Sequence, residues 1–272
     1  MYTIFGLNGF IGSEIINHLK KKKIKVNHIK RDQTYFKKNL GHVIYCVGSD
    51  NWKKLPKEGF ESNLGHLKEI LFNSKFKSFL FLSSTRVYIN NSNKKTNENS
   101  DIIVNSQVLN DYYNLLKLTS ESICLNLKKK NIKIIRLSNV LGNNFNSPLV
   151  FPSLIRDAIK KNEITLLINK NSTKDYIHID DVINLIFKII KVGKKKVYNL
   201  ASGKNITLLK IAKLIQNETK CKLKFKNQFT LITEPKININ RIKKEFRFKP
   251  KKNIDLQIKN IIKDFKKDLI SN

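Results

Sequence analysis

The chain has 272 residues, and 40% of them are apolar, which is enough to build the core of one large domain or of a domain with a smaller appendage. Its formal net charge of +32 would suit an anionic partner such as nucleic acid or a membrane surface. However, only six of the 53 basic residues are arginine, which leaves 53 − 6 = 47 lysines, and base and phosphate recognition favours the arginine fork. The lysines also occur in short runs at the expected ends of elements, so we do not expect a nucleic-acid-binding protein.

The cysteines and the N-terminal residues bear on the cellular compartment. Cys46, Cys124 and Cys221 have neither the spacing of a metal site nor that of a disulfide framework, and unpaired thiols suit a reducing compartment. The first residues do not form a basic leader followed by a long apolar segment, and no apolar run reaches the ~18 residues of a membrane-spanning helix. We therefore expect a cytoplasmic protein without a membrane segment or a metal site.

The first motif in the chain is a glycine turn between a strand and a helix. Tyr2–Phe5 is a β-branched and aromatic run, and Ser13–Lys21 has apolar residues at helical spacing. Between them, Gly6 allows a tight turn, Gly9 lets backbone N–H groups approach a pyrophosphate, and Gly12 lets the helix pack against the strand. An ordinary glycine-rich turn is the alternative, but the strand–turn–helix order favours a dinucleotide site. The expected cofactor-binding residues here are Gly6, Gly9, Phe10, Ile11 and Gly12.

The end of the second expected strand, Ile24–Ile29, bears on the choice of cofactor. In dinucleotide folds, an acidic residue about 20 positions after the glycine turn binds the adenosine ribose, whereas a cation accommodates a 2′-phosphate. Lys30 and Arg31 occupy this place, so we expect NADP to be preferred, with NAD as the alternative cofactor. Arg31 carries more of this inference, because lysine is common throughout the chain.

Strands and helices alternate along the rest of the chain. We expect strands at His42–Val47 (closed by Gly48), Phe79–Leu82 and Ile132–Leu137, a helix at Asn63–Phe72, and a polar surface loop at residues 89–110. This alternation predicts an α/β protein with a Rossmann-type, doubly wound parallel sheet whose ligands bind at the carboxyl ends of the strands. The glycine turn, Val47 with Gly48, Ser84 and Asn139 all lie at such ends, and Val47 and Gly48 are expected beside the cofactor.

A tyrosine and a lysine stand four residues apart in the helix expected from Asp111 onwards. Positions i and i+4 share a helix face, so Tyr113 and Lys117 project side by side. An ammonium near a phenol favours the phenolate, which turns a poor base into a usable one at neutral pH. Taken alone, such a pair is most often incidental in an amphipathic helix. Its place among the strand ends described above favours a catalytic pair.

These motifs together resemble the short-chain dehydrogenase/reductase family, in its extended branch of nucleotide-sugar epimerases, dehydratases and reductases. The matching stretches, in family order, are GLNGFIG at 6–12, SSTRVY at 83–88, YNLLK at 113–117, RLSNVLG at 136–142, KDYIHIDDV at 174–182, VYNLASG at 197–203 and INRIKKEFRFKP at 239–250. The resemblance implies an NAD(P)-dependent enzyme with an NAD(P)-binding Rossmann domain at residues 1–141. Residues 142–272 would combine the last Rossmann elements (about 175–202) with a smaller C-terminal substrate-binding portion (about 142–174 and 203–272).

The resemblance also implies roles for catalytic residues at matching positions. Ser84 would hydrogen-bond the reacting oxygen of the sugar, and Tyr113 would be the general acid/base. Lys117 would hold the nicotinamide ribose and favour the phenolate of Tyr113. Asn63 would support the active site from the neighbouring helix.

Contacts to a nucleotide-diphosphate sugar are implied in the same way. Ser84 and Thr85 would face the sugar, while Asn139 and Lys174 would contact the diphosphate. Lys174 stands where arginine is usual in the family, so the charge is kept but the bidentate fork is not.

The resemblance implies hydride transfer between a sugar carbon and the nicotinamide, with Tyr113 moving the hydroxyl proton. A 4,6-dehydratase of this family needs an Asp-Glu pair directly after the serine, and Thr85 and Arg86 stand there instead. Lys30 and Arg31 favour an NADPH-linked reductase of a 4-keto sugar; a nucleotide-sugar 4-epimerase with tightly bound NAD is the alternative. From other classes, a non-catalytic dinucleotide sensor would not need the serine, tyrosine and lysine together. A nucleic-acid-binding protein would show an affinity that falls steeply with salt.

A homodimer is implied as well, because two helices of each chain pair across a two-fold axis in this branch. The corresponding helices, 63–72 and 112–127, carry the apolar residues Leu64, Leu67, Leu71, Leu116, Ile123 and Leu127. The same residues could instead cover the sheet within one chain.

Overall fold

Six parallel strands form the central sheet in the computed structural model, which describes residues 1–27, 39–48, 54–127, 131–226, 231–250 and 254–271. The strands, in sheet order, are β10 (Val197–Leu200), β6 (Ile132–Leu137), β4 (Ser78–Ser84), β3 (His42–Tyr45), β1 (Tyr2–Phe5) and β2 (Val26–Asn27). Every pairing between neighbours is parallel. Because β2 and β3 lie on opposite sides of β1, the strand order reverses there, and open α/β sheets bind ligands at such a point.

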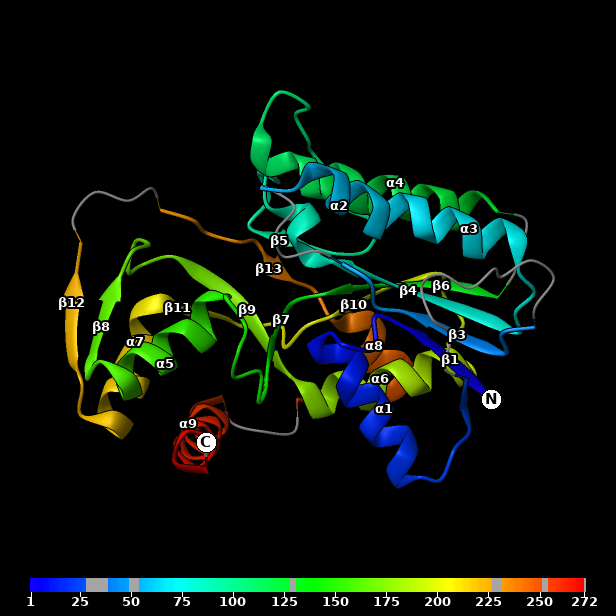
Figure 1. Cartoon of the computed structure of the whole chain (residues 1–272). Coiled ribbons are helices and arrows are strands. Elements are labelled where there is room, and N and C mark those ends of the chain that lie inside the picture. The colour runs from blue at the N-terminus through cyan, green and yellow to red at the C-terminus, as the bar shows by residue number, and fades with distance from the viewer. Residues whose placement is uncertain (28–38, 49–53, 128–130, 227–230, 251–253, 272) are drawn as a thin grey trace.

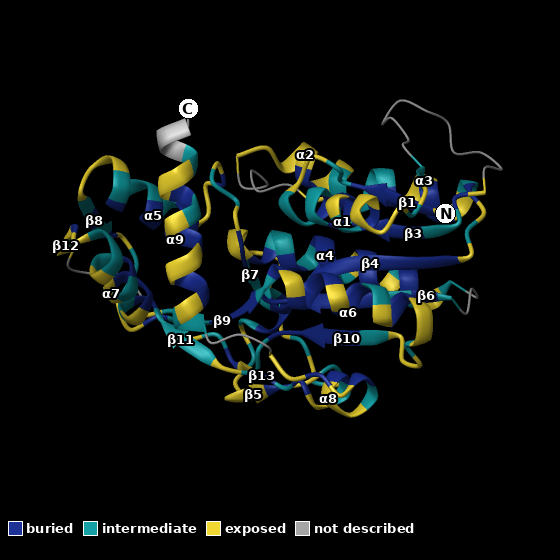
Figure 2. Ribbon diagram, turned by 90° about the horizontal axis from the view of Figure 1, so that it is seen from below, coloured by how far each residue is buried: buried dark blue, intermediate teal, exposed yellow. Residues whose placement is uncertain are grey.

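Helices cover both faces of this sheet (Figure 1). One face is covered by α1 (Phe10–Lys21), α6 (Ile179–Val192) and α8 (Asn240–Phe246), and the other by α2 (Pro56–Phe60), α3 (His66–Asn73) and α4 (Tyr112–Asn126). A π-helical turn, η1 (Glu61–Gly65), joins α2 to α3. Between the two helix layers, β4 and β6 are buried along most of their length (Figure 2), as expected of parallel strands.

A second, smaller lobe adjoins the sheet where β7 follows directly after β6. Its strands are β7 (Asn139–Leu141), β9 (Thr173–His178) and β11 (Asn205–Thr207) in one sheet, and β8 (Glu163–Leu166) and β12 (Lys222–Phe225) in another. Its helices are α5 (Val150–Lys160), α7 (Leu208–Thr219) and α9 (Ile254–Ser271). They enclose a separate apolar core that includes Ile155, Ile211 and Ile262. A further pair, β5 (Lys95–Thr96) with β13 (Lys236–Ile237), joins segments that are distant in sequence.

The fold class predicted from the sequence is confirmed, while several element bounds differ. β1 and β6 have the predicted bounds, because each is an uninterrupted run rich in β-branched residues that the sheet buries. Of the predicted strand Ile24–Ile29, β2 contains Val26–Asn27, and residues 28 and 29 lie outside the described residues. The predicted loop at 89–110 contains β5, whose partner β13 no local pattern could indicate. Among the helices that the structure describes, none has both the length and the apolar character that a membrane crossing needs.

Candidate active site

Backbone packing at the glycine turn leaves no room for a side chain at two of its glycines. Gly6 has a φ of +90°, and a Cβ there would lie 2.9 Å from the carbonyl carbon of Cys46, just beyond β3. A Cβ at Gly12 would lie 2.1 Å from the Gly6 carbonyl oxygen. The Gly9 N–H closes the turn by donating to that oxygen at 3.1 Å. The N-terminus of α1 is therefore held against the carboxyl ends of β1 and β3.

The start of α1 has the properties of a phosphate-binding helix end. No side chain caps the helix at Gly9, and its first turn contains no acidic residue. The backbone N–H groups and the positive end of the helix dipole are therefore not opposed by a carboxylate of that turn. On the β3 side, Val47 is buried. At Gly48 there is open space: among the described residues other than its chain neighbours, no heavy atom lies within 4 Å of where a Cβ would be. This cradle fits the pyrophosphate of a dinucleotide.

The remaining residues predicted to contact the cofactor fall into two sets. Phe10 and Ile11 are half-buried in the first turn of α1. The Phe10 ring packs against Gly142 beyond β7, where a Cβ would lie 2.5 Å from the ring. Lys30 and Arg31, on which the preference for NADP was predicted, lie outside the described residues.

α4 presents Tyr113 and Lys117 one helical turn apart. The Lys117 side chain is buried, and its ammonium donates a hydrogen bond to the Leu82 carbonyl oxygen of β4 at 3.1 Å. The same ammonium lies 5.8 Å from the centroid of the Tyr113 ring and 5.1 Å from that of Phe81. Tyr113 itself is half-buried. The Lys117 ammonium thus lies near the Tyr113 ring and is hydrogen-bonded to β4, the strand that ends in Ser84.

The positive charge on Lys117 is opposed by burial and supported by its neighbours. Burial lowers the pKa of Lys117 to about 8, although Glu121 and then Cys46 raise it. Glu121 stands one turn further along α4 and is itself buried; it accepts a hydrogen bond from the Ser83 hydroxyl at 2.5 Å. Its carboxylate pairs with the Arg136 guanidinium of β6 at 2.7 Å. An anion held in this way helps a buried ammonium to keep its proton.

Ser84 ends β4 at the point where the chain enters a short 3-10 helix, Thr85–Tyr88. Its hydroxyl oxygen accepts a hydrogen bond from the Arg86 N–H at 3.1 Å and caps that helix. In the sheet register, Ser84 pairs with Leu137, the last residue of β6. Thr85 is buried and donates to the Leu137 carbonyl oxygen at 3.4 Å. Ser84 and Thr85 therefore lie at the same sheet edge as the start of the second lobe.

Asn63 lies in the π-helical turn η1 and is fully buried. Its side-chain amide donates to the Gly59 carbonyl oxygen at 2.8 Å, and its backbone carbonyl accepts a hydrogen bond from the Ser120 hydroxyl of α4 at 2.9 Å. Its side-chain oxygen has no hydrogen-bond partner among the described residues. Asn63 thus joins the η1 turn to the helix that carries Lys117, and π-helical turns are frequent at functional sites.

Asn139 and Lys174 lie on paired strands of the second lobe, β7 and β9. The Asn139 side chain donates to the Asp175 carbonyl oxygen at 3.0 Å. The Lys174 ammonium lies 3.6 Å from a carboxylate oxygen of Glu234. Both residues predicted to contact the diphosphate therefore have a partner within the chain.

Asp175 is a buried carboxylate that ties the two lobes together. It accepts hydrogen bonds from the Ser138 hydroxyl at 2.9 Å, the Ser202 N–H at 2.8 Å and the Lys204 N–H at 2.9 Å. Burial raises the pKa of Asp175, while the bonds from Ser202 and Ser138 lower it. Since Ser138 follows β6 and Ser202 follows β10, this carboxylate fixes the strand ends from which the second lobe departs.

The predicted site residues therefore form two neighbouring groups. The first lies at the carboxyl edge of the sheet and comprises Gly6, Gly9, Gly12, Val47, Gly48, Ser84, Thr85, Tyr113 and Lys117, with Asn63 behind α4. The second consists of Asn139 and Lys174 on the adjoining lobe. Leu137 links them, because it pairs with Ser84 and precedes Asn139 by two residues.

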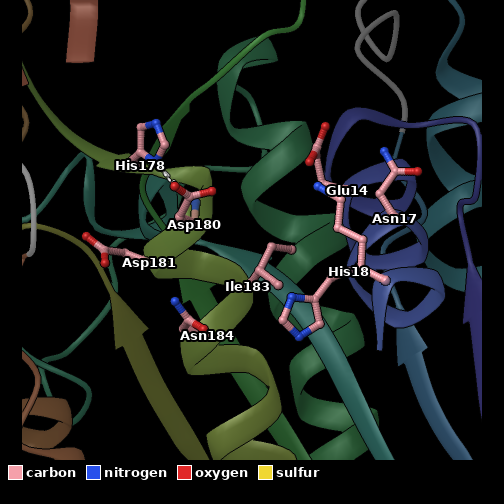
Figure 3. Close-up of a pocket in the computed structure, with 9 residues that line it drawn as sticks. Glu14, Asn17, His18, His178, Asp180, Asp181, Ile183 and Asn184 are labelled. Carbon is pink, nitrogen blue, oxygen red and sulfur yellow. Dashed lines mark hydrogen bonds and ion pairs between the residues drawn. The ribbon is translucent and has the colours of Figure 1, made fainter. Parts of the chain in front are cut away.

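A pocket of about 390 Å³ opens elsewhere, between α1 and α6 (Figure 3). Its lining residues are Glu14, Asn17, His18, Lys21, His178, Asp180, Asp181, Ile183 and Asn184. The predicted catalytic residues are not part of this lining. His178 is the N-cap of α6, and its ring nitrogen accepts the Asp180 N–H at 3.2 Å. Among the residues that the structure describes, no group of His, Cys, Asp or Glu side chains is arranged to hold a metal ion.

The doubly wound sheet, with a glycine turn at its reversal point, defines a Rossmann-type α/β protein. Residues 35–201 match the family model described as the NAD dependent epimerase/dehydratase family. The chain belongs to this family, whose short-chain dehydrogenase/reductase character was predicted from the sequence and is confirmed.

One curated relative agrees with this assignment, and two solved structures share the fold. The UDP-glucose 4-epimerase of Mycoplasma genitalium is 29% identical over 203 residues, which are 64% of this chain and 58% of the relative. The solved structure of MoeE5 in complex with UDP-glucose and NAD superimposes with a TM-score of 0.85 at 14% identity, over 98% of this chain and 99% of that chain. The solved structure of RMD from Pseudomonas aeruginosa complexed with NADPH superimposes with a TM-score of 0.80 at 18% identity, over 97% of this chain and 99% of that chain. The matched stretches span less than two thirds of the length of the curated relatives.

Three residues that bear on the site were not singled out from the sequence. Glu121 follows Lys117 by four residues, so helical spacing could have indicated it. Arg136 is one of only six arginines and is the first residue of the RLSNVLG motif, and these two facts could have identified it from the sequence. Glu234 stands in a linking segment, and nothing local indicates that its carboxylate reaches Lys174.

Proposed function

We propose that the chain is an NAD(P)-dependent enzyme that acts on a nucleotide sugar by hydride transfer at a sugar carbon. The observation that carries this proposal is the buried Lys117 ammonium, held between the Tyr113 ring and the strand that ends in Ser84. A dinucleotide sensor without turnover has no use for a costly buried charge beside a phenol. Family membership and the epimerase relative support the same substrate class.

Each side chain has a distinct part in this proposal. Bound NAD or NADP would accept or supply the hydride at the reacting carbon. Tyr113 exchanges a proton with the sugar hydroxyl, while Lys117 stabilises the phenolate and holds the cofactor ribose. Ser84 hydrogen-bonds the reacting oxygen, with Thr85 beside it. Asn63 acts indirectly, since its carbonyl positions α4 through Ser120.

Binding of the two ligands is assigned to the two groups of residues. Gly6, Gly9, Phe10, Ile11, Gly12, Val47 and Gly48 form the proposed dinucleotide cradle. Asn139 and Lys174 are proposed to face the substrate diphosphate. The free thiols of Cys46, Cys124 and Cys221 support a reducing, cytoplasmic setting.

Two reactions fit this proposal, and we favour the reduction of a 4-keto sugar by NADPH. Lys30 and Arg31 support it, because cations at this point of the sequence suit a 2′-phosphate. A 4-epimerase with tightly bound NAD is the second candidate, which the UDP-glucose 4-epimerase of Mycoplasma genitalium supports. Consumption of added NADPH by a 4-keto nucleotide sugar indicates the first reaction. Interconversion of nucleotide sugars without added cofactor indicates the second.

Replacing Tyr113 by phenylalanine tests the catalytic assignment. Without the hydroxyl no proton can be transferred, so turnover should fall by about 10²-fold or more. Cofactor affinity, measured by fluorescence titration with NADPH, should stay close to that of the wild type, because the ring is kept. Unchanged turnover of the Tyr113→Phe variant would remove the catalytic role.

A further inference from the structure

An ion pair occupies the place in the second lobe where the proposed function needs an anion site. The Lys174 ammonium lies 3.6 Å from a carboxylate oxygen of Glu234. The Lys174 side chain is 30% exposed and that of Glu234 only 12%, so the carboxylate lies deeper than the ammonium. Glu234 belongs to the segment that runs from the second lobe back to the sheet, between β12 and β13 (Figure 1).

Backbone hydrogen bonds fix this segment against β9. The Glu234 N–H donates to the Thr173 carbonyl oxygen at 3.1 Å, and the Thr173 N–H donates to the Ile232 carbonyl oxygen at 3.0 Å. The Asn205 side chain donates to the Glu234 carbonyl oxygen at 2.6 Å. The position of residue 234 is therefore set by its backbone, and its carboxylate remains available to pair with cations.

Arg86 lies beside the proposed catalytic tyrosine, and its charge also affects Glu234. Its guanidinium carbon lies 6.0 Å from the centroid of the Tyr113 ring, and one of its nitrogens donates to the Asn110 carbonyl oxygen at 3.1 Å. Burial raises the pKa of Glu234, whereas Lys174 and then Arg86 lower it. The ion-pair partner of this carboxylate is Lys174, which also has the largest lowering effect on its pKa. Carboxylate and phosphate oxygens pair with the same lysine and arginine donors.

We propose that Glu234 is a specificity residue that occupies, as an internal counter-ion, the anion subsite of Lys174. This inference rests on the proposed function, because it treats Lys174 as a ligand of the substrate diphosphate. A phosphate group binds there only if the Glu234 carboxylate moves away, and otherwise the two like charges repel each other. Glu234 therefore weakens the binding of a diphosphate at Lys174 relative to that of a group with less negative charge.

Binding of inorganic pyrophosphate to the full-length chain tests this inference without requiring turnover. Isothermal titration calorimetry at constant ionic strength should give the Glu234→Gln variant an affinity on the order of tenfold higher than that of the wild type. The amide keeps the shape of the side chain, and the backbone bonds of residue 234 are untouched. Glu234→Ala is a second variant, for the case in which the glutamine variant does not fold, and should change the affinity in the same direction.

Two further variants make the result specific. Glu163→Gln removes the same unit of charge from another ion pair with a lysine, Lys224, at 2.6 Å in the second lobe. It should leave the affinity at the wild-type value, which controls for the net charge of +32. Adding Lys174→Met to Glu234→Gln should abolish the gain. Equal affinity of the wild type and Glu234→Gln, or a gain that persists without Lys174, would overturn the proposal.

The outcome is separable from that of the proposed function. If no nucleotide sugar is turned over but Glu234→Gln gains affinity for pyrophosphate in a Lys174-dependent way, the anion subsite stands and the enzymatic proposal fails. If a nucleotide sugar is turned over and the variant shows no gain, only the inference about Glu234 fails.

Discussion

Lys117 carries its charge where burial makes charge costly, so the site should depend on pH. Burial lowers the pKa of this ammonium to about 8, from an ordinary value of 10.5. As pH rises through about 8, Lys117 loses the proton that supports the Tyr113 phenolate. We therefore expect kcat/KM for the substrate to fall above this pH. Between pH values of about 8 and 10.5, Lys117 is protonated in the unfolded chain and largely deprotonated in the folded chain. Because the unfolded chain binds more protons in this range, the free energy of unfolding should rise with pH there.

The Lys117→Arg variant provides the matched comparison, because a guanidinium stays protonated across this range. Any activity that it retains should not decline at alkaline pH. The measurement is the pH profile of kcat/KM for both proteins under saturating cofactor. A wild-type profile without an alkaline decline would show that the charge on Lys117 is not required.

At the level of single residues, the sequence predicts contacts between residues of the same helix or strand. It does not predict contacts between residues of different elements. Helical spacing predicts that Tyr113 and Lys117 share a face, and the ammonium does lie beside the ring. The pair of Lys174 with Glu234 joins a strand to a linking segment, so no spacing rule applies to it. The positions of Lys30 and Arg31 relative to a ribose remain a prediction from the sequence.

α4 is anchored to the sheet by a buried ion pair, and this anchoring can be measured. The Arg136 guanidinium binds both oxygens of Glu121, and both side chains are almost fully buried. Removing one partner leaves an unpaired buried charge, so Arg136→Met should lower the free energy of unfolding by about 3–5 kcal/mol. Urea denaturation of the cofactor-free protein measures this loss.

The matched control replaces both partners of that pair with methionine. Because neither member of the Glu121–Arg136 pair is then left without its partner, the Glu121→Met, Arg136→Met double variant should lose much less stability than the sum of the single variants. The double variant also removes the anion that supports the proton on Lys117, so its alkaline decline in kcat/KM should shift to lower pH. Additive losses of stability would show that the two side chains act independently.

The strands whose bounds could be predicted are short runs rich in β-branched and aromatic residues. β1 and β6 are such runs, and both have the predicted bounds. The helix predicted at Asn63–Phe72 begins earlier in the structure, at Pro56, and passes through the π-helical turn η1. In that turn the carbonyl oxygen of the buried Asn63 accepts a hydrogen bond from the Ser120 hydroxyl of α4, a contact between two elements that no local pattern indicates. β5 depends on β13, so it follows from tertiary structure and not from local sequence.

Across the whole molecule, the chain leaves the sheet to build the second lobe and then returns to it. Residues of α8, such as Ile242 and Phe246, pack in the same core as β10, although they follow most of the second lobe in sequence. The returning segment places Glu234 beside Lys174, so the course of this segment also sets the charge beside that lysine. This arrangement gives the linking segment a direct influence on which anions can bind.

The helix layer formed by α2, η1, α3 and α4 bears on the predicted dimer. Leu67 and Leu71 are buried against the sheet of their own chain, which is the alternative use that the sequence left open, and Leu116 is also buried. Apolar area nevertheless remains on the outer side of this layer, where Phe60 is 47% exposed and Phe72 is 59% exposed. Large aromatic side chains exposed on one helix layer are candidates for burial against a second copy.

We expect the protein to sediment as a dimer at micromolar concentration through this helix layer. Phe72→Glu places a charge in the expected interface, so it should shift the equilibrium towards the monomer by about tenfold or more in dissociation constant. Leu167→Glu is the control, since Leu167 is 58% exposed but lies just after β8 in the second lobe. Sedimentation equilibrium of the three proteins measures the effect. A wild-type monomer at these concentrations, or an equal effect of both variants, would contradict a dimer formed by α3 and α4.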